Sequence, residues 1–185
     1  IGDMVIFLPF IEAISKNFGV PVSLLVKESS KALQFLKDNK TINNIIILDR
    51  GHKIKNGRHD GIIGSYNLVK DLKKHNFDKI FIFNSSLRFN LIAKIAGIKD
   101  IRQYPLFDKK NQHIIDTAKD FIKKELNKDT ASNPEIFINN QLIKNSKSNY
   151  KINNEEINIL LGIGGSGPTK RIPSKIFINF MKLVT

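Results

Sequence analysis

A glycine-rich stretch near the end of the sequence carries the clearest chemical pattern. Residues 162–171 read GIGGSGPTKR and follow an apolar run. Glycines let a backbone approach a ligand closely and turn its N–H groups toward an anion. Ser166, Gly167, Thr169 and Lys170 together suit a pyrophosphate, because they combine hydroxyls, backbone N–H groups and positive charge. We therefore expect this loop to bind phosphate; an ordinary surface loop is the alternative.

Two known phosphate motifs fit this loop incompletely. Gly162, Gly164 and Gly167 match the spacing G-x-G-x-x-G, but Pro168 and Pro173 delay the helix that a dinucleotide fingerprint requires. The P-loop pattern fails because the lysine follows a threonine rather than a glycine. A dinucleotide-dependent oxidoreductase remains an alternative, and it requires an acidic ribose-binding residue about 20 residues beyond the loop.

A carboxylate near the start of the sequence is the second candidate. Asp3 follows Gly2 and precedes an apolar segment, as in a strand-to-helix turn. In open α/β sheets, ligands bind beyond the carboxyl ends of the strands, where a carboxylate can act as a general base. Asp3 can equally cap the helix that follows, which chemistry alone favours. The two roles are compatible.

Basic side chains near two other predicted strand ends are weaker candidates. Lys53 and Arg58 lie in a loop over residues 50–64 that contains four glycines, where they could contact an anionic acceptor. Arg88 follows a predicted strand and has no structural role that the sequence reveals. Helix capping is the simpler explanation for the two serines before it, at 85 and 86.

The composition excludes several classes of protein. The chain has 185 residues, enough for one domain or for one domain and a piece of a second. It has no cysteine, which excludes disulfides and thiolate chemistry, and its four histidines lack metal-ligand spacing. We therefore expect no metal site. No apolar run approaches the roughly 18 residues that a membrane span needs.

The net charge of +13 suggests an anionic partner. However, 25 of the 30 basic residues are lysine, and isoleucine and asparagine are also abundant, as genome-wide nucleotide bias would produce. The scarcity of arginine disfavours nucleic acid, since bidentate contacts to bases and phosphates favour arginine.

Strand and helix patterns alternate along the chain. Strands are expected at 22–26, 45–48, 79–83, 99–102, 134–138 and 157–161. Helices are expected at 3–17, 29–38, 66–75, 85–96 and 111–126, and from Pro173 onward. This order predicts an α/β fold, with a mostly parallel sheet covered by helices on both faces.

The sequence suggests two domains. Residues 139–156 are polar and rich in asparagine, so we expect a linker between a first domain over 1–138 and the start of a second over 157–185. The opening residues resemble a turn whose strand precedes the sequence, and the last residues stop within a helical pattern. We expect a fragment of a longer protein.

Three blocks resemble glycosyltransferase family 9, the ADP-heptose:lipopolysaccharide heptosyltransferases. IGDMVIFLPF at 1–10 is similar to the family's opening (I/L)-G-D and Leu-Pro pattern. FNSSLR at 83–88 resembles its G-S-L-R segment, and GGSGPTKRIP at 164–173 resembles the motif that opens its second domain. The blocks occur in the family's order and span nearly the whole chain.

This resemblance implies a GT-B enzyme with a Rossmann-like N-terminal domain on the acceptor side and an active site between two domains. It implies an inverting, metal-independent transfer of heptose from ADP-heptose to a sugar of the lipopolysaccharide core. By position, Asp3 matches the catalytic base, Lys170 matches the lysine that neutralises the departing diphosphate, and Ser166 falls near the phosphates.

The partners implied are a nucleotide sugar as co-substrate, without a further cofactor, and an anionic lipopolysaccharide-core acceptor. A basic surface suits a phosphorylated lipid acceptor, so we expect a cytoplasmic protein in peripheral contact with the inner membrane, and no nucleic-acid partner. The 185 residues lack most of the donor pocket, so we expect them to be inactive alone. A non-catalytic protein that binds an anionic glycan is the remaining alternative.

Overall fold

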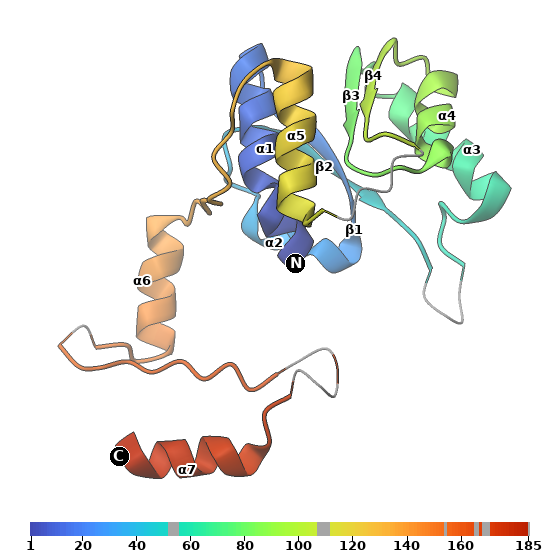
Figure 1. Ribbon diagram of the computed structural model, residues 1–185. Helices are drawn as coiled ribbons and strands as arrows, with labels where there is room; N and C mark the ends of the chain where they lie inside the picture. Colours follow the sequence, from blue (N-terminus) through green and yellow to red (C-terminus); the bar gives the residue numbers. More distant parts are fainter. Residues whose placement is uncertain (52–55, 107–111, 154, 165–166, 168–170, 185) are drawn as a thin grey trace. The chain divides into compact units, whose positions relative to one another are not determined.

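A computed structural model describes residues 1–51, 56–106, 112–153, 155–164, 167 and 171–184 (Figure 1). The chain divides into two compact units, Ile1–Ile138 and Asn139–Thr185. The first unit has helices and parallel strands, which confirms the expected α/β class.

The strands of the first unit form two parallel pairs. β1 (Val22–Lys27) pairs with β2 (Ile42–Leu48), and β3 (Lys79–Ile82) pairs with β4 (Asp100–Gln103). Each pair is joined through a helical crossover, which parallel pairing requires. The helices of this unit are α1 (Gly2–Phe18), η1 (Glu28–Ser30), α2 (Ala32–Phe35), α3 (Gly61–Lys73), α4 (Leu87–Ile95) and α5 (Ile114–Leu126).

Contacts along α1 fix the direction of the strands. The ring of Phe7, in the first half of α1, lies 5.1 Å from that of Phe83, just after β3. The ring of Phe18, at the end of α1, lies 6.1 Å from Phe81, and Lys79 at the start of β3 lies over the same ring. β3 therefore runs opposite to α1, and its carboxyl end lies near the first turns of that helix.

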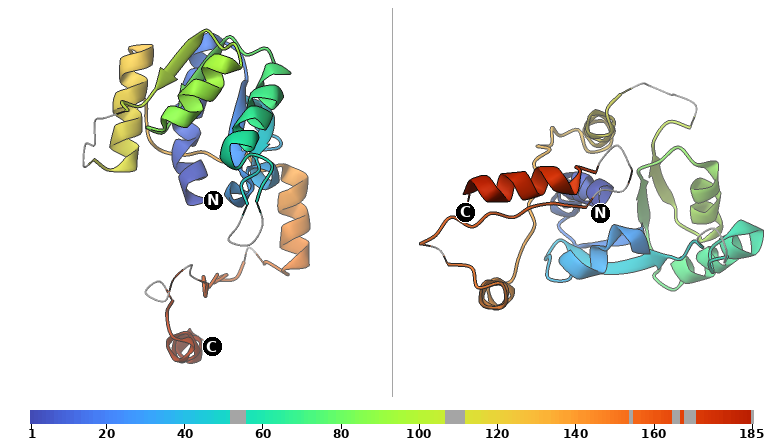
Figure 2. Two further views of the ribbon diagram at one scale, coloured as in Figure 1. Left: turned by 90° about the vertical axis from the view of Figure 1, so that its right-hand side faces the viewer. Right: turned by 90° about the horizontal axis from the view of Figure 1, so that it is seen from below.

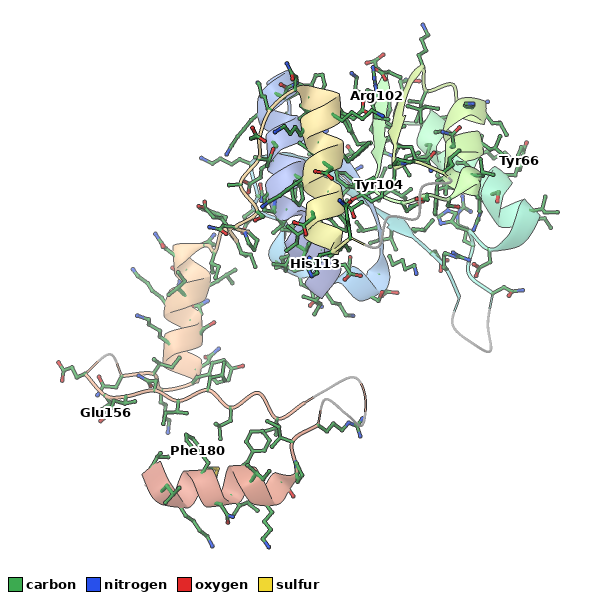
Figure 3. All side chains as sticks on the ribbon, viewed as in Figure 1. Tyr66, Arg102, Tyr104, His113, Glu156 and Phe180 are labelled. Carbon is green, nitrogen blue, oxygen red and sulfur yellow. The ribbon has the colours of Figure 1, made fainter. Side chains whose placement is uncertain are left out.

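Helices cover both faces of the strands, as the sequence predicts (Figure 2). Leu24 packs with α1 and α2, whereas its neighbour Leu25 packs against the cluster formed by α3 and α4, since successive strand residues point to opposite faces. α1 and α5 share a second cluster that includes Phe10, Phe121 and Tyr104, and Tyr104 lies beside α5 (Figure 3).

Two helices of the first unit differ from the sequence prediction. The helix expected at 29–38 is divided into η1 and α2, because Lys31 adopts a left-handed conformation with φ 57°. α3 starts at Gly61 rather than at residue 66. Gly64, which the sequence placed in a loop, packs so closely on His59 that a Cβ would lie 2.2 Å from its carbonyl carbon.

The second unit departs further from prediction. The expected linker contains α6 (Asn140–Asn149), whose N-terminus is capped because the Asn139 side chain accepts a bond from the Gln141 N–H at 2.8 Å. The strand expected at 157–161 is absent, as is the one expected at 134–138 at the end of the first unit, since these described residues pair with no other segment. α7 (Ser174–Val184) begins directly after Pro173, as expected.

The core between α3 and β2 provides a test of the fold. Leu68 is 0% exposed among Leu48, Val69 and Leu72. Leu68→Ala should lower the free energy of unfolding by about 2–5 kcal/mol, because it removes buried methyl groups and leaves a cavity. Leu33→Ala, on a side chain that is 55% exposed, should change it by less than about 0.5 kcal/mol in the same urea titration. Equal losses in the two variants would contradict the packing described.

Candidate functional site

Asp3 lines a hollow of about 280 Å³ at the carboxyl end of β1. α1 contributes Asp3, together with Met4 and Phe7; Lys27 ends β1, and the serines at 29 and 30 belong to η1. The Asp3 side chain is exposed and has no hydrogen-bond or ion-pair partner among the described residues. The hollow therefore combines a free carboxylate, an ammonium group and hydroxyls, which suits a hydroxylated ligand that carries negative charge.

Asp3 is not the helix cap that chemistry alone favoured. α1 begins one residue earlier than expected, so the cap position falls on Ile1, whose side chain makes no capping bond. Asp3 lies within the first turn instead. Its carboxylate is thus not occupied by backbone N–H groups and is available to a ligand.

Sequence reasoning missed Lys27. Lys27 comes directly after the strand expected at 22–26, at the edge where Asp3 lies. The rule that ligands bind beyond the carboxyl ends of parallel strands could therefore have identified Lys27 as a site residue. Of the two serines, Ser30 accepts a bond from the Ala32 N–H at 3.3 Å, so its hydroxyl also helps to hold the turn.

Asp60 holds the two ends of the loop after β2 together. Its carboxylate accepts bonds from the N–H groups of Gly51 at 2.7 Å and Gly57 at 2.8 Å, and from Arg50 Nε at 3.1 Å. These bonds, led by those from Gly51 and Gly57, lower the pKa of Asp60 to about 2. A Cβ at Gly57 would lie 2.4 Å from the Gly51 nitrogen, so the loop's ends meet at a position that only glycine allows.

A buried histidine anchors the same loop to α3. His59 is 3% exposed; its Nδ1 accepts a bond from the Asp49 N–H at 3.0 Å, which leaves the ring proton on Nε2, 3.1 Å from Asp71. Burial raises the pKa of Asp71, but hydrogen bonds from Lys74, His59 and Arg58 outweigh it and hold the pKa well below its usual range. Both ring nitrogens are engaged, so His59 has a structural role.

The expected acceptor-binding residues have structural partners where they are described. Arg58 forms an ion pair with Asp71 at 2.9 Å. Arg88, for which the sequence revealed no structural role, donates through Nε to Ser65 Oγ at 2.9 Å and through Nη2 to the His59 carbonyl. Arg88 thus ties α4 to α3, and the earlier expectation was wrong. Lys53 lies outside the described residues. Acceptor contacts by these three residues stay predictions.

The architecture has a match among solved structures. The crystal structure described as "glycosyl transferase family 9 from Veillonella parvula" superposes with a TM-score of 0.75 over 98% of this chain, at 20% sequence identity. The chain has the fold of a family 9 glycosyl transferase. It spans 57% of the length of that solved chain. No family model matches the sequence, and no curated protein matches it. The resemblance noted in the sequence is therefore confirmed at the level of the fold.

The glycine-rich loop is only partly described in this family 9 fold. Ser166, Thr169 and Lys170 lie outside the described residues. A Cβ at Gly162, Gly164 or Gly167 would meet no atom within 4 Å, and no strand precedes the loop. Phosphate binding by Ser166, Gly167, Thr169 and Lys170 stays a prediction.

The described residues contain neither a metal-binding cluster nor a membrane-spanning helix. Within that part of the chain, no group of three or more histidine, aspartate or glutamate residues is placed to hold a metal ion. None of its helices is both long and apolar enough to cross a membrane.

The low pKa of Asp60 predicts an acid-sensitive loop. Because the folded-state pKa is about 2 and the ordinary value is 3.8, the carboxylate stabilises the fold above pH 3.8, and this contribution is lost as pH falls toward 2. Urea titrations across that range should show a smaller loss of unfolding free energy in Asp60→Asn than in the parent chain. Asp38→Asn removes an exposed carboxylate that has no described partner, and it serves as the control variant. An Asp60→Asn chain with the parent's pH dependence would refute the assignment.

Proposed function

We propose that this chain holds the acceptor-side domain, and the start of the donor-binding domain, of an inverting, metal-independent glycosyltransferase that moves heptose from ADP-heptose to a sugar of the lipopolysaccharide core. The observation that carries the proposal is the free Asp3 carboxylate in a hollow at the strand ends of a family 9 fold. The sequence motifs around Asp3 and at 164–173 supply the choice of heptose and ADP.

The proposed chemistry is a single displacement. Asp3 takes the proton from the acceptor hydroxyl as its oxygen attacks the anomeric carbon of the donor. The bond from that carbon to the diphosphate oxygen breaks on the opposite face, so the configuration inverts and ADP departs with the electron pair. Lys27 and Ser29, beside Asp3 in the hollow, are placed to orient an anionic acceptor.

The donor is proposed to bind the glycine-rich loop. Ser166, Gly167, Thr169 and Lys170 would contact its diphosphate, with Lys170 neutralising the charge that develops on departure. The nucleotide sugar is a co-substrate, and no further cofactor takes part. The chain spans 57% of the similar solved chain, so we propose that a longer protein supplies the rest of the donor site. Sugar transfer by the 185 residues alone would contradict this.

The two alternatives have less support. An oxidoreductase needs a strand directly before its phosphate loop, and the described residues 157–164 contain none. A non-catalytic glycan-binding protein gives no reason for an unpartnered carboxylate at the strand ends, and it predicts that Asp3 can be changed without effect on turnover.

Substitution of Asp3 tests the proposal in the longer protein. Asp3→Asn should lower kcat for heptose transfer by about 10²–10⁴, because the acceptor proton loses its base, while calorimetry should show unchanged ADP-heptose binding. Glu12→Gln is the matched control, since Glu12 lies on the same helix and pairs with Lys16 at 3.8 Å, away from the hollow. Full activity in Asp3→Asn would overturn the proposed role.

A further inference from the structure

Two neighbouring helices expose apolar side chains that the core does not use. Leu68, Val69, Leu72 and Ile92 point inward from α3 and α4. On the outer side, a second set of residues faces solvent, and Tyr66 projects there (Figure 3). The α3–α4 apolar surface consists of Ile62, Ile63, Tyr66, Leu87, Leu91 and Ile95.

The side chains of this surface are largely exposed, and those on α4 are regularly arranged. Ile62 is 91% exposed and Ile63 is 78% exposed. Leu87, Leu91 and Ile95 recur every four residues, so they form one row along α4. Single exposed apolar residues need no explanation, but a row on one helix beside further exposed apolar residues on a neighbouring helix is typical of an interaction site.

Positive charge accompanies the apolar side chains. Lys70 Nζ lies 4.6 Å from the centre of the Tyr66 ring, and Lys73, Lys74 and Lys94 are exposed on or beside the same two helices. Asp71 is the single acidic residue of α3, α4 has none, and the Asp71 carboxylate is already paired with Arg58, His59 and Lys74. Lysine side chains therefore surround the apolar surface, and its two helices carry no free acidic group.

This surface begins at the edge that holds Asp3. α3 starts beyond the carboxyl end of β2 and α4 beyond that of β3, so Ile62, Ile63 and Leu87 lie at the same edge as the hollow. A partner bound there would reach the carboxyl ends of the same strands.

We propose that the α3–α4 apolar surface docks on a membrane that contains anionic lipids. Apolar side chains would enter the acyl boundary and the lysines would contact lipid phosphates, which is how a surface with this composition binds without spanning the bilayer. Charge complementarity selects this occupant, since anionic headgroups match a basic surround. Docking would bring a lipid-anchored acceptor to the edge of the strands that holds Asp3; only that consequence rests on the proposed function.

Vesicle co-sedimentation of the 185-residue chain tests the docking. The chain should bind vesicles of phosphatidylglycerol and phosphatidylcholine in equal parts, bind phosphatidylcholine alone far less, and lose binding as salt rises. Ile62→Ser with Ile63→Ser should weaken the partition coefficient about tenfold or more, and Lys70→Ala about fivefold. Circular dichroism and urea midpoints establish that each variant folds.

Leu91 and Leu33 form a matched pair, because both are 55% exposed and only Leu91 belongs to the surface. Leu91→Ser should weaken vesicle binding and Leu33→Ser should not. Equal effects in this pair, or unchanged binding in the double isoleucine variant, would overturn the proposal. Light scattering in the absence of vesicles gives a further test. If the parent chain forms an oligomer and the double isoleucine variant is a monomer, the surface joins two copies and the membrane proposal is overturned.

Failure of this inference can be told apart from failure of the proposed function. If the chain does not bind vesicles but the longer protein transfers heptose with a dependence on Asp3, only the docking proposal fails. If vesicle binding follows the variants but Asp3→Asn leaves transfer unchanged, the membrane surface stands and the proposed catalytic role falls.

Discussion

The burial of α1 on two sides is the constraint on which the first unit depends. Leu8 belongs to the cluster with β1 and α2, Phe10 to the cluster with α5, and both side chains are fully buried. Phe7 packs against both clusters. Because α1 is held in this way, its first turn is fixed at the strand ends, and Asp3 needs no bond of its own to stay in place.

A second set of contacts shapes the same edge. The Asp60 and Asp71 carboxylates accept hydrogen bonds from backbone N–H groups and an imidazole, and they form ion pairs with several cations. These contacts hold the ends of a glycine-containing loop against α3. Their pKa values are lowered, so both carboxylates stay charged and keep these bonds at pH values below the ordinary 3.8. Arg58 and Arg88 take part in this framework, which explains why basic residues near a candidate acceptor site need not all contact the acceptor.

α3 carries apolar side chains on two sides, one facing the core and one facing solvent. Leu68 and Leu72 face the core, while Ile62 and Tyr66 face solvent among lysines. α3 therefore carries apolar side chains both toward the core and toward solvent, and a core alone does not require the second set. The proposed membrane docking would give those side chains a physical reason to be there.

The sequence by itself determined most of the alternation of strands and helices, the end of α1 at Gly19 and the place of Asp3 at the start of a helix, because these features follow from local periodicity and from a left-handed residue that favours glycine. Only the tertiary structure decided that Lys27 lines the hollow with Asp3, that His59 is buried and that Arg88 bonds to it, since the partners are far apart in sequence. The same reason explains the strands expected at 134–138 and 157–161. A strand exists only where another segment accepts and donates its hydrogen bonds, and no pattern within one segment can supply that partner.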